Sequence, residues 1–355
     1  MNNNKLRDRE AIVGREGIIF RVYGYWHPPR AYICDPEYAH QSIYRSKDPR
    51  ACRARGKHVY YKFYGDEGLR FAGQNYPIHT VWVKPLAKRL VGVHKRDIWK
   101  KRQPEQRLQS LVRKQPTDSL LEALHSVLDL IMQRSSLSRS DFGVFGSLLH
   151  GFYHPDYSDL DFIVYGRDKL TRLTETLSAL YKEAGTPLKN EYSDAGAVEN
   201  KEWKFANYHK REYLRHQEKK LIYGVLDHKH SGRKIKVEFE PVKSWNEIKS
   251  DYADVTHISQ EGWVKLKARV TDAMDAAFMP SIYQIEPVKI IQGARVRNLR
   301  RILSFVEEFR LQAEQDDLVL VEGNLENVLS TKESFDQVTL TYGPRYYQQT
   351  LKIAH

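Results

Sequence analysis

The chain has 355 residues, 41% of them hydrophobic, and a formal net charge of +12 at pH 7. This length exceeds the usual size of one domain, so we expect two or three domains, and no apolar run approaches the roughly 20 residues of a membrane span. The two cysteines, Cys34 and Cys52, are too few for a disulfide framework or a four-ligand zinc site. The polar start of the sequence lacks the apolar segment of a signal peptide, so we expect a cytoplasmic protein without a membrane partner.

Residues 1–83 are predicted to form a β-rich N-terminal domain. Residues 17–25 and 58–64 are dense in aromatic and β-branched residues, and prolines and glycines punctuate them, which is typical of strands joined by turns. The aromatic residues alternate with basic ones, a pattern that suits a platform on which unpaired bases stack. Aromatic residues in strands also commonly form a core, so both interpretations stay open.

Residues 84–116 are predicted to form a basic connector. Between Lys84 and Lys114 eleven residues are basic and two are acidic. Such a segment attracts polyanions, and nucleic acid is the commonest polyanion in a cytoplasm. A solvated linker rich in lysine is the alternative. The residues predicted to contact nucleic acid are Lys95, Arg96, Lys100, Lys101 and Arg102.

Residues 117–245 are predicted to form a domain of alternating helices and strands. Asp118 is a helix start signal, and apolar residues recur at helical spacing from Leu120 to Ile131. The pattern then predicts strands at 142–145 and 159–166, a helix at 168–185, an exposed helix at 202–220, and strands at 221–227 and 234–242. The remaining residues, 246–355, are predicted as a mixed, partly β C-terminal domain, in which 296–315 fit either a helix or a pair of strands.

Two acidic residues lie in the apolar strand predicted at 159–166. Alternate side chains of a strand project to the same face, so Asp159 and Asp161 lie together. Like charges so close raise each other's pKa unless a cation lies between them, and carboxylate oxygens suit Mg²⁺. Glu238 and Glu240, on the last predicted strand of this domain, also share a face and offer a third carboxylate. The pattern predicts a divalent metal site; an exposed sheet edge that carries protective charges is the alternative.

A glycine turn precedes this strand. Gly146 and Ser147 follow one strand and open a short helix, so backbone N–H groups and a hydroxyl are available to bind a phosphate. Acidic metal ligands beside a phosphate-binding turn are typical of phosphoryl or nucleotidyl transfer. A serine hydrolase is not indicated, because the G-x-S-x-G motif of that class is absent.

These residues resemble the motifs of the DNA polymerase beta-like nucleotidyltransferase superfamily. The resemblance comprises Gly146-Ser147, then eleven residues, then Asp159-Leu-Asp161, and a later strand acid, Glu238, three residues before Pro241. It covers about 142–242. It implies an α+β fold, with a mixed-sheet nucleotidyltransferase core that has helices on one side, flanked here by the β-rich N-terminal domain and the mixed, partly β C-terminal domain.

The resemblance implies how the carboxylates act. Asp159 and Asp161 would ligate two Mg²⁺ ions, for which Mn²⁺ can substitute, and Glu238 would be the third metal ligand, with Glu240 as the alternative. The ions would hold the triphosphate of an NTP substrate and activate the attacking hydroxyl. A glutamate at the third position departs from the aspartate that is commoner in the superfamily.

The resemblance also implies a phosphate site. Gly146 and Ser147 would bind the β- and γ-phosphates of the NTP. His150 stands where many relatives have arginine or lysine, and it is a weaker, pH-dependent anion partner. Another cation is the alternative, and the candidates are Lys204, Arg211 and Lys234.

Three functions fit these motifs. The first, which we predict, is transfer of NMP from an NTP to a hydroxyl of a nucleic acid, such as the 3′ end of RNA, tRNA or DNA, and the basic flanks favour it. The second is modification of a small molecule or of a protein side chain. The third is a nucleic-acid-binding protein that keeps the fold without catalysis. The predicted partners are therefore an NTP and a nucleic acid acceptor.

Overall fold

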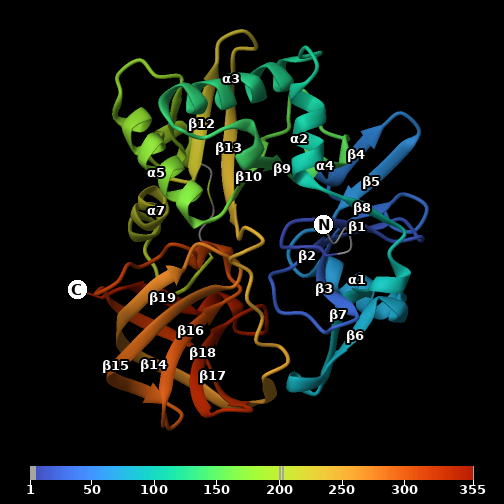
Figure 1. Cartoon of the computed structure of the whole chain (residues 1–355). Helices are drawn as coiled ribbons and strands as arrows, with labels where there is room; N and C mark the ends of the chain where they lie inside the picture. The colour runs from blue at the N-terminus through green and yellow to red at the C-terminus, as the bar shows by residue number, and fades with distance from the viewer. Residues whose placement is uncertain (1–4, 200, 202–203, 355) are drawn as a thin grey trace.

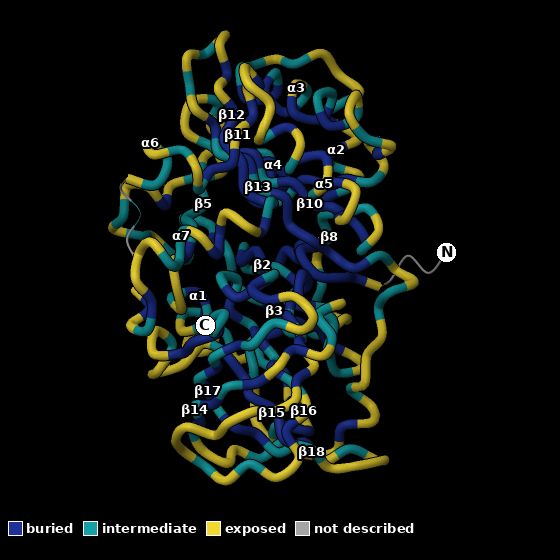
Figure 2. Tube along the Cα trace, turned by 90° about the vertical axis from the view of Figure 1, so that its left-hand side faces the viewer, coloured by how far each residue is buried: buried dark blue, intermediate teal, exposed yellow. Residues whose placement is uncertain are grey.

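The computed structural model describes residues 5–199, 201 and 204–354, which form three regions in chain order (Figure 1). The predicted α+β fold is confirmed, because most helices gather in the central region while the two flanking regions are mainly strands. Figure 2 shows that buried segments concentrate in the middle of the molecule, where the three regions meet. In the described part of the chain, no helix is long and apolar enough to cross a membrane.

The N-terminal region is one sheet with a single α-helix. The strands are ordered β4-β5-β3-β2-β1-β8, and β7 pairs with both β3 and β6. The predicted strands at 17–25 and 58–64 are confirmed as β2 and β5. The bounds are β1 Ala11–Val13, β2 Ile18–Val22, β3 Ala31–His40, β4 Cys52–Arg55, β5 His58–Lys62, α1 Glu67–Asn75, β6 Thr80–Val83, β7 Lys88–His94 and β8 Lys100–Arg102.

The basic segment 84–116 is folded rather than a solvated connector. β7 and β8 complete the N-terminal sheet, and β8 lies antiparallel to β1 with Lys101 opposite Ile12. Helix α2 (Pro104–Val112) then buries Leu108 in the core of the central region. Strand pairing satisfies backbone polar groups that a buried loop would leave unpaired. The segment therefore belongs to the scaffold of two regions.

The central region is a five-stranded sheet with helices packed against one face. Its order is β11-β12-β13-β10-β9, with β10 and β13 parallel. The bounds are α3 Ser119–Arg134, β9 Phe142–Val144, α4 Gly146–His150, β10 Leu160–Tyr165, α5 Arg167–Lys182, β11 Leu188–Asn190, α6 Ala195–Val198, α7 Lys210–Lys219, β12 Tyr223–His228 and β13 Arg233–Val242. Of the exposed helix predicted at 202–220, residues 202–203 lie outside the described residues, and α7 begins only at Lys210.

Strand alternation separates the two faces of the central sheet. Leu160, Phe162 and Phe239 point into a core with the leucines of α3 and α5. The start of α3 is fixed by Asp118, whose carboxylate accepts a hydrogen bond from the backbone N–H of Leu121 at 3.0 Å. The opposite face of the sheet carries the acidic residues and is turned toward the N-terminal sheet and the C-terminal strands (Figure 1).

The C-terminal region is a closed β-barrel. Its strands follow the order β14-β15-β16-β18-β17, β17 pairs back onto β14, and β16 and β18 are parallel. These five strands close as a Greek key, which is the arrangement of OB-fold barrels, and a sixth strand, β19, pairs with β17. The bounds are β14 Val255–Asp275, β15 Ser281–Gly293, β16 Leu299–Ser304, β17 Leu318–Ser330, β18 Ser334–Leu340 and β19 Thr350–Ile353. For residues 296–315, the structure has strand β16 and one short 3-10 helix, Glu307–Phe309.

Candidate active site

The two aspartates lie at the start of β10, on the sheet face that the helices leave open. Asp161 is partly buried, whereas Asp159, just before the strand, is exposed to solvent. In the described part of the chain, no hydrogen bond or ion pair joins either carboxylate to another side chain. Burial, together with the nearby carboxylate of Asp159, raises the pKa of Asp161 to about 7. The pair therefore has the chemistry of a cation site.

Asp159 and Asp161 can supply part of the coordination shell of Mg²⁺ but not all of it. Within residues 5–199, 201 and 204–354, no group of three His, Cys, Asp or Glu side chains is arranged to hold a metal ion. Mg²⁺ commonly takes one or two carboxylates and completes its shell with water and substrate phosphates. Asp159 and Asp161 suit this mode of binding, in which the substrate supplies the missing oxygens.

The two glutamates of β13 have different surroundings. Glu238 is in register with Asp161 on the parallel neighbour, and its nearest cations are Lys236 at 3.7 Å and Arg310 at 3.9 Å. Glu240 is buried, and its carboxylate accepts hydrogen bonds from both terminal nitrogens of Arg310 and from Arg9. Burial alone would raise the pKa of Glu240, but Arg310 holds it below the ordinary value. The geometry therefore favours Glu238 as the third acid.

The glycine turn lies directly against Asp161. Gly146 has a φ of +59°, and a Cβ built on it would lie 2.6 Å from Oδ2 of Asp161. Only glycine combines this left-handed backbone with so close an approach. Ser147 is the second residue of the short helix α4, and its hydroxyl lies 3.4 Å from that of Ser158. The glycine turn and the two aspartates, Asp159 and Asp161, thus form one site.

Comparison with known proteins agrees with this geometry. Residues 127–250 match the family model described as a nucleotidyltransferase domain. The predicted resemblance is confirmed. The chain also aligns over 362 positions, at 21% identity, with an uncharacterized protein of Methanocaldococcus jannaschii, and the alignment covers 98% of this chain and 99% of that protein. The similarity thus extends over both regions that flank the nucleotidyltransferase domain. No solved structure matches the chain.

Exchanging Gly146 for alanine should impair the site. The methyl group would meet Asp161 and would be strained at this φ, so we expect a loss of about 1–3 kcal/mol in the free energy of unfolding and at least a tenfold loss of NMP transfer. Gly65→Ala is the matched control, because Gly65 has a φ of +58° with nothing within 4 Å of its built Cβ. Urea unfolding and a transfer assay measure both effects; equal losses in the two variants would contradict a role for the contact with Asp161.

His150 does not face the nucleotide site. Its ring is buried, packs 5.3 Å from that of Tyr38, and lies with Nδ1 2.8 Å from Nη1 of Arg102. Burial lowers the pKa of His150, so the ring is a poor anion partner in any case. Helix α4 turns this side chain into the interface with the N-terminal sheet. The predicted role of His150 in nucleotide binding is therefore corrected to a packing role.

Two lysines face the aspartates and were not predicted. Lys62, at the end of β5, and Lys236, on β13, both carry positive charge close enough to lower the pKa values of Asp159 and Asp161. Lys236 lies two residues before Glu238 on β13, so strand alternation in the sequence already places both side chains on one face. Lys62 comes from the N-terminal sheet, and no local pattern reveals it. Lys234, an alternative considered from sequence, is instead ion-paired with Asp194 at 2.7 Å.

The five basic residues predicted to bind nucleic acid differ in their exposure to solvent. Arg102 is partly buried and hydrogen-bonded to His150, and Lys101 is partly buried within β8. Lys95 is exposed and donates a hydrogen bond to the carbonyl of Pro29 at 2.7 Å. The other two, Arg96 and Lys100, are also exposed. Three of the five side chains are thus exposed and two are partly buried.

Proposed function

We propose that the protein transfers NMP from an NTP to a hydroxyl of a nucleic acid in a metal-dependent reaction. The single observation that carries the proposal is the pair Asp159 and Asp161, which lacks a hydrogen bond or ion pair to any described side chain and lies against the Gly146 turn of a nucleotidyltransferase domain. The net charge of +12 supports an anionic acceptor.

Each group has a definite task in this reaction. The turn at Gly146 and Ser147 offers N–H donors to the β- and γ-phosphates. Lys62 and Lys236 offset the triphosphate charge. Two divalent ions, held by Asp159, Asp161 and Glu238, would neutralise the leaving pyrophosphate and lower the pKa of the acceptor hydroxyl.

The bond changes balance without a further reactant. The acceptor oxygen bonds to the α-phosphorus of the NTP, and the bond from that phosphorus to the bridging oxygen breaks. Pyrophosphate leaves with the bonding electrons, and the hydroxyl proton passes to water. The protein supplies positioning and electrostatic stabilisation, which are the main contributions in phosphoryl transfer.

Calorimetric titration with a non-hydrolysable NTP analogue tests whether the site binds nucleotide through a metal. The analogue should bind at least about tenfold more tightly with Mg²⁺ than with EDTA, because a divalent ion held by Asp159 and Asp161 would attract the phosphates. Asp159→Asn/Asp161→Asn should remove this difference. Equal affinity with and without Mg²⁺ in the unaltered protein, or an undiminished Mg²⁺ effect in the double variant, would contradict metal binding by these aspartates.

Lys62→Met should raise the KM for NTP. Loss of one cation that faces the phosphates is expected to weaken binding about tenfold, while the chemical step changes less. Lys57→Met is the matched control, because Lys57 is an exposed lysine in the turn between β4 and β5. Steady-state kinetics with varied NTP measure both variants, and a KM unchanged by Lys62→Met would exclude this lysine from the nucleotide site.

A further inference from the structure

Exposed aromatic rings gather on the segment that follows β18. Tyr342 and Tyr347 are 43% and 46% exposed, although tyrosine rings usually bury much of their surface. The rings of Tyr342 and Tyr346 are parallel to within 2°, with centroids 4.7 Å apart. Tyr347 packs edge-on against Tyr346 at 5.0 Å. The segment therefore presents a short stack of rings at the surface of the barrel.

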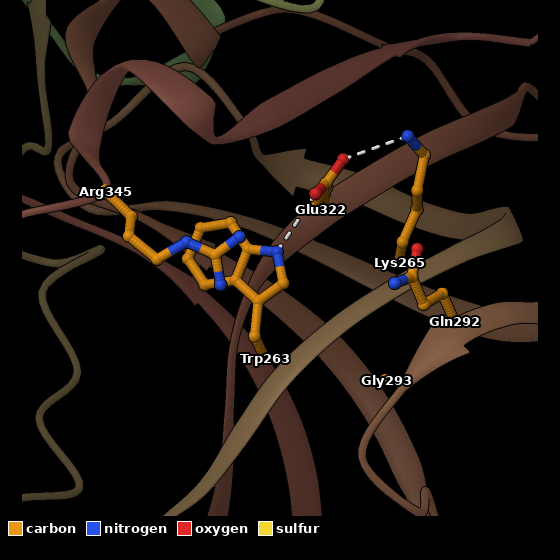
Figure 3. Close-up of a pocket in the computed structure, with 6 residues that line it drawn as sticks. All are labelled: Trp263, Lys265, Gln292, Gly293, Glu322 and Arg345. Carbon is orange, nitrogen blue, oxygen red and sulfur yellow. Dashed lines mark hydrogen bonds and ion pairs between the residues drawn. The ribbon is translucent and has the colours of Figure 1, made fainter.

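A cation and an indole extend these rings toward β14. The guanidinium of Arg345 lies 3.7 Å from the centroid of the Trp263 ring (Figure 3). Trp263 donates a hydrogen bond to Glu322 at 3.0 Å, and Lys265 pairs with the same carboxylate at 3.1 Å. These four residues line a cavity of about 230 Å³. We call Trp263, Tyr342, Tyr346 and Tyr347 the aromatic surface.

Packed rings connect the aromatic surface to the candidate active site. Tyr346 lies 5.4 Å from Phe205, and Phe205 lies 5.2 Å from Phe309. The next residue, Arg310, binds Glu240 and approaches Glu238 to 3.9 Å. A row of packed side chains thus links the aromatic surface to the candidate active site.

Several aromatic residues of the N-terminal region pack against one another instead. Tyr44 packs against Phe63 at 4.6 Å and against Phe71 at 5.1 Å, and Tyr38 is buried. They form a core, which was the alternative to a base-stacking platform. The first loop of the barrel is also unavailable, because Phe278 and Met279 within it are buried.

We infer that the aromatic surface, with Arg345 beside it, binds single-stranded nucleic acid and holds the acceptor strand of the reaction. Every base has a flat face that stacks on tyrosine or tryptophan, and arginine serves both stacking and phosphate binding. Barrels of the OB arrangement carry such sites in other proteins. The inference rests on the proposed function, of which it names the acceptor and the surface that binds it.

Fluorescence anisotropy with labelled RNA or DNA of about 12 nucleotides, without NTP, tests the inference. Tyr342→Ala/Tyr347→Ala should weaken binding about 25-fold or more, since each lost stack costs about fivefold or more. The salt dependence of binding should stay the same, because stacking releases no counterions. Tyr342→Phe/Tyr347→Phe should bind within about twofold of the unaltered protein, since phenylalanine stacks as tyrosine does.

Trp82→Ala is the control for loss of an exposed aromatic ring elsewhere, because Trp82 is 53% exposed on β6. It should bind as the unaltered protein does, and circular dichroism should show all variants folded. A folded Tyr342→Ala/Tyr347→Ala that binds RNA and DNA with unchanged affinity would overturn the inference.

A transfer assay on the same variants separates the inference from the function. Asp159→Asn/Asp161→Asn should bind the oligonucleotide normally and transfer nothing. Normal binding and transfer by the tyrosine variant would reject the aromatic surface and leave the function standing. Loss of binding in the tyrosine variant, with no transfer by the unaltered protein, would support the surface and reject the function.

Discussion

Asp161→Asn is expected to abolish NMP transfer while the protein stays folded. A metal site contributes several kcal/mol to phosphoryl transfer, so the rate should fall about 10³-fold or more. The folded pKa of Asp161, about 7, lies above its unfolded value, so at pH 8 the ionised carboxylate opposes folding in the absence of metal. The asparagine variant should therefore be at least as stable as the unaltered protein in EDTA at that pH.

Asp156→Asn is the matched control for this substitution. Asp156 is an exposed aspartate in the loop that leads to β10, so its loss should leave both transfer and stability unchanged. Label transfer and urea unfolding in EDTA measure the two properties. Transfer by Asp161→Asn within tenfold of the unaltered rate would contradict the assignment of the metal site.

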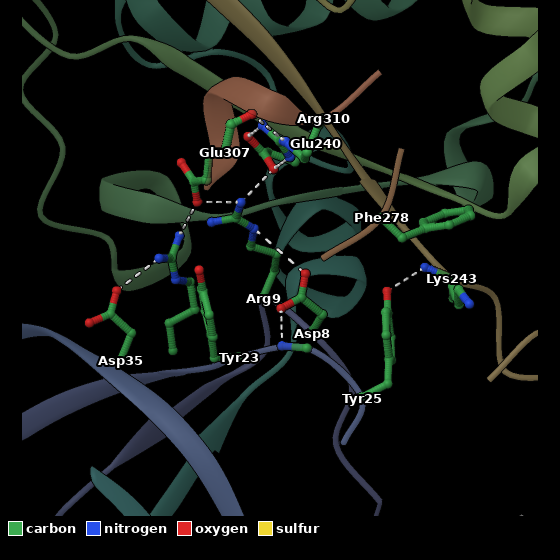
Figure 4. A network of polar contacts seen from close by, with 12 residues as sticks. Asp8, Arg9, Tyr23, Tyr25, Asp35, Glu240, Lys243, Phe278, Glu307 and Arg310 are labelled. Atoms are coloured by element: carbon green, nitrogen blue, oxygen red, sulfur yellow. Dashed lines mark hydrogen bonds and ion pairs between the residues drawn. The ribbon is translucent and has the colours of Figure 1, made fainter. Parts of the chain in front are cut away.

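Arg310→Met should destabilise the protein by about 3–5 kcal/mol, because it leaves Glu240 buried without its main partner. Figure 4 shows this network, in which residues from all three regions meet. Arg9 of the N-terminal region donates to Glu240 at 2.6 Å and to Glu307 of the C-terminal region at 2.7 Å. The cost should therefore appear as weaker docking of the barrel as well as lower overall stability.

A second substitution distinguishes an unpaired charge from lost packing. Glu240→Gln in the Arg310→Met background removes the stranded charge and should recover a large part of the loss. Arg300→Met is the control, because Arg300 and Glu333 form a pair in which each side chain is 44% exposed, worth about 0–1 kcal/mol. Urea unfolding of the variants tests the account, and a cost for Arg310→Met no greater than that for Arg300→Met would contradict it.

The nucleotidyltransferase domain was predictable because its signals are local. Helical spacing from Leu120 to Ile131 corresponds to α3, and the apolar run that contains Asp161 corresponds to β10. Alternation placed the acids on one face, and the parallel register of Asp161 with Glu238 agrees with that expectation. Hydrophobic periodicity in the sequence predicts a helix or strand wherever one face of that element is buried.

The remaining features depend on contacts between distant segments. The basic residues of segment 84–116 do not indicate which strands pair, because pairing depends on backbone hydrogen bonds rather than on charge. The pairing of this segment with β1 and β3 was therefore not predicted. The different surroundings of Glu238 and Glu240 depend on Arg9 and Arg310, which lie far away in sequence. Glu238 and Glu240 lie on the same face of one strand, so the sequence pattern does not distinguish them. Only their contacts with residues from the other regions do.

The C-terminal barrel shows the limit of periodicity in another way. The stretch 296–315 fits a helix or strands because short apolar runs do not distinguish the two. In the structure, residues 299–304 pair in parallel with β18 and therefore form a strand, β16. The aromatic surface also depends on distant segments, since Arg345, which is adjacent to Tyr346 in sequence, lies against Trp263 of β14.

The most direct test of the central claim is a label-transfer assay with each of the four α-labelled NTPs, Mg²⁺ or Mn²⁺, and tRNA, single-stranded RNA or single-stranded DNA as acceptor. We expect label to reach a nucleic acid with the unaltered protein, and none to reach it with EDTA or with Asp159→Asn/Asp161→Asn. Label that appears only on protein, or equal transfer by the double variant, would contradict metal-dependent transfer of NMP to nucleic acid at this site.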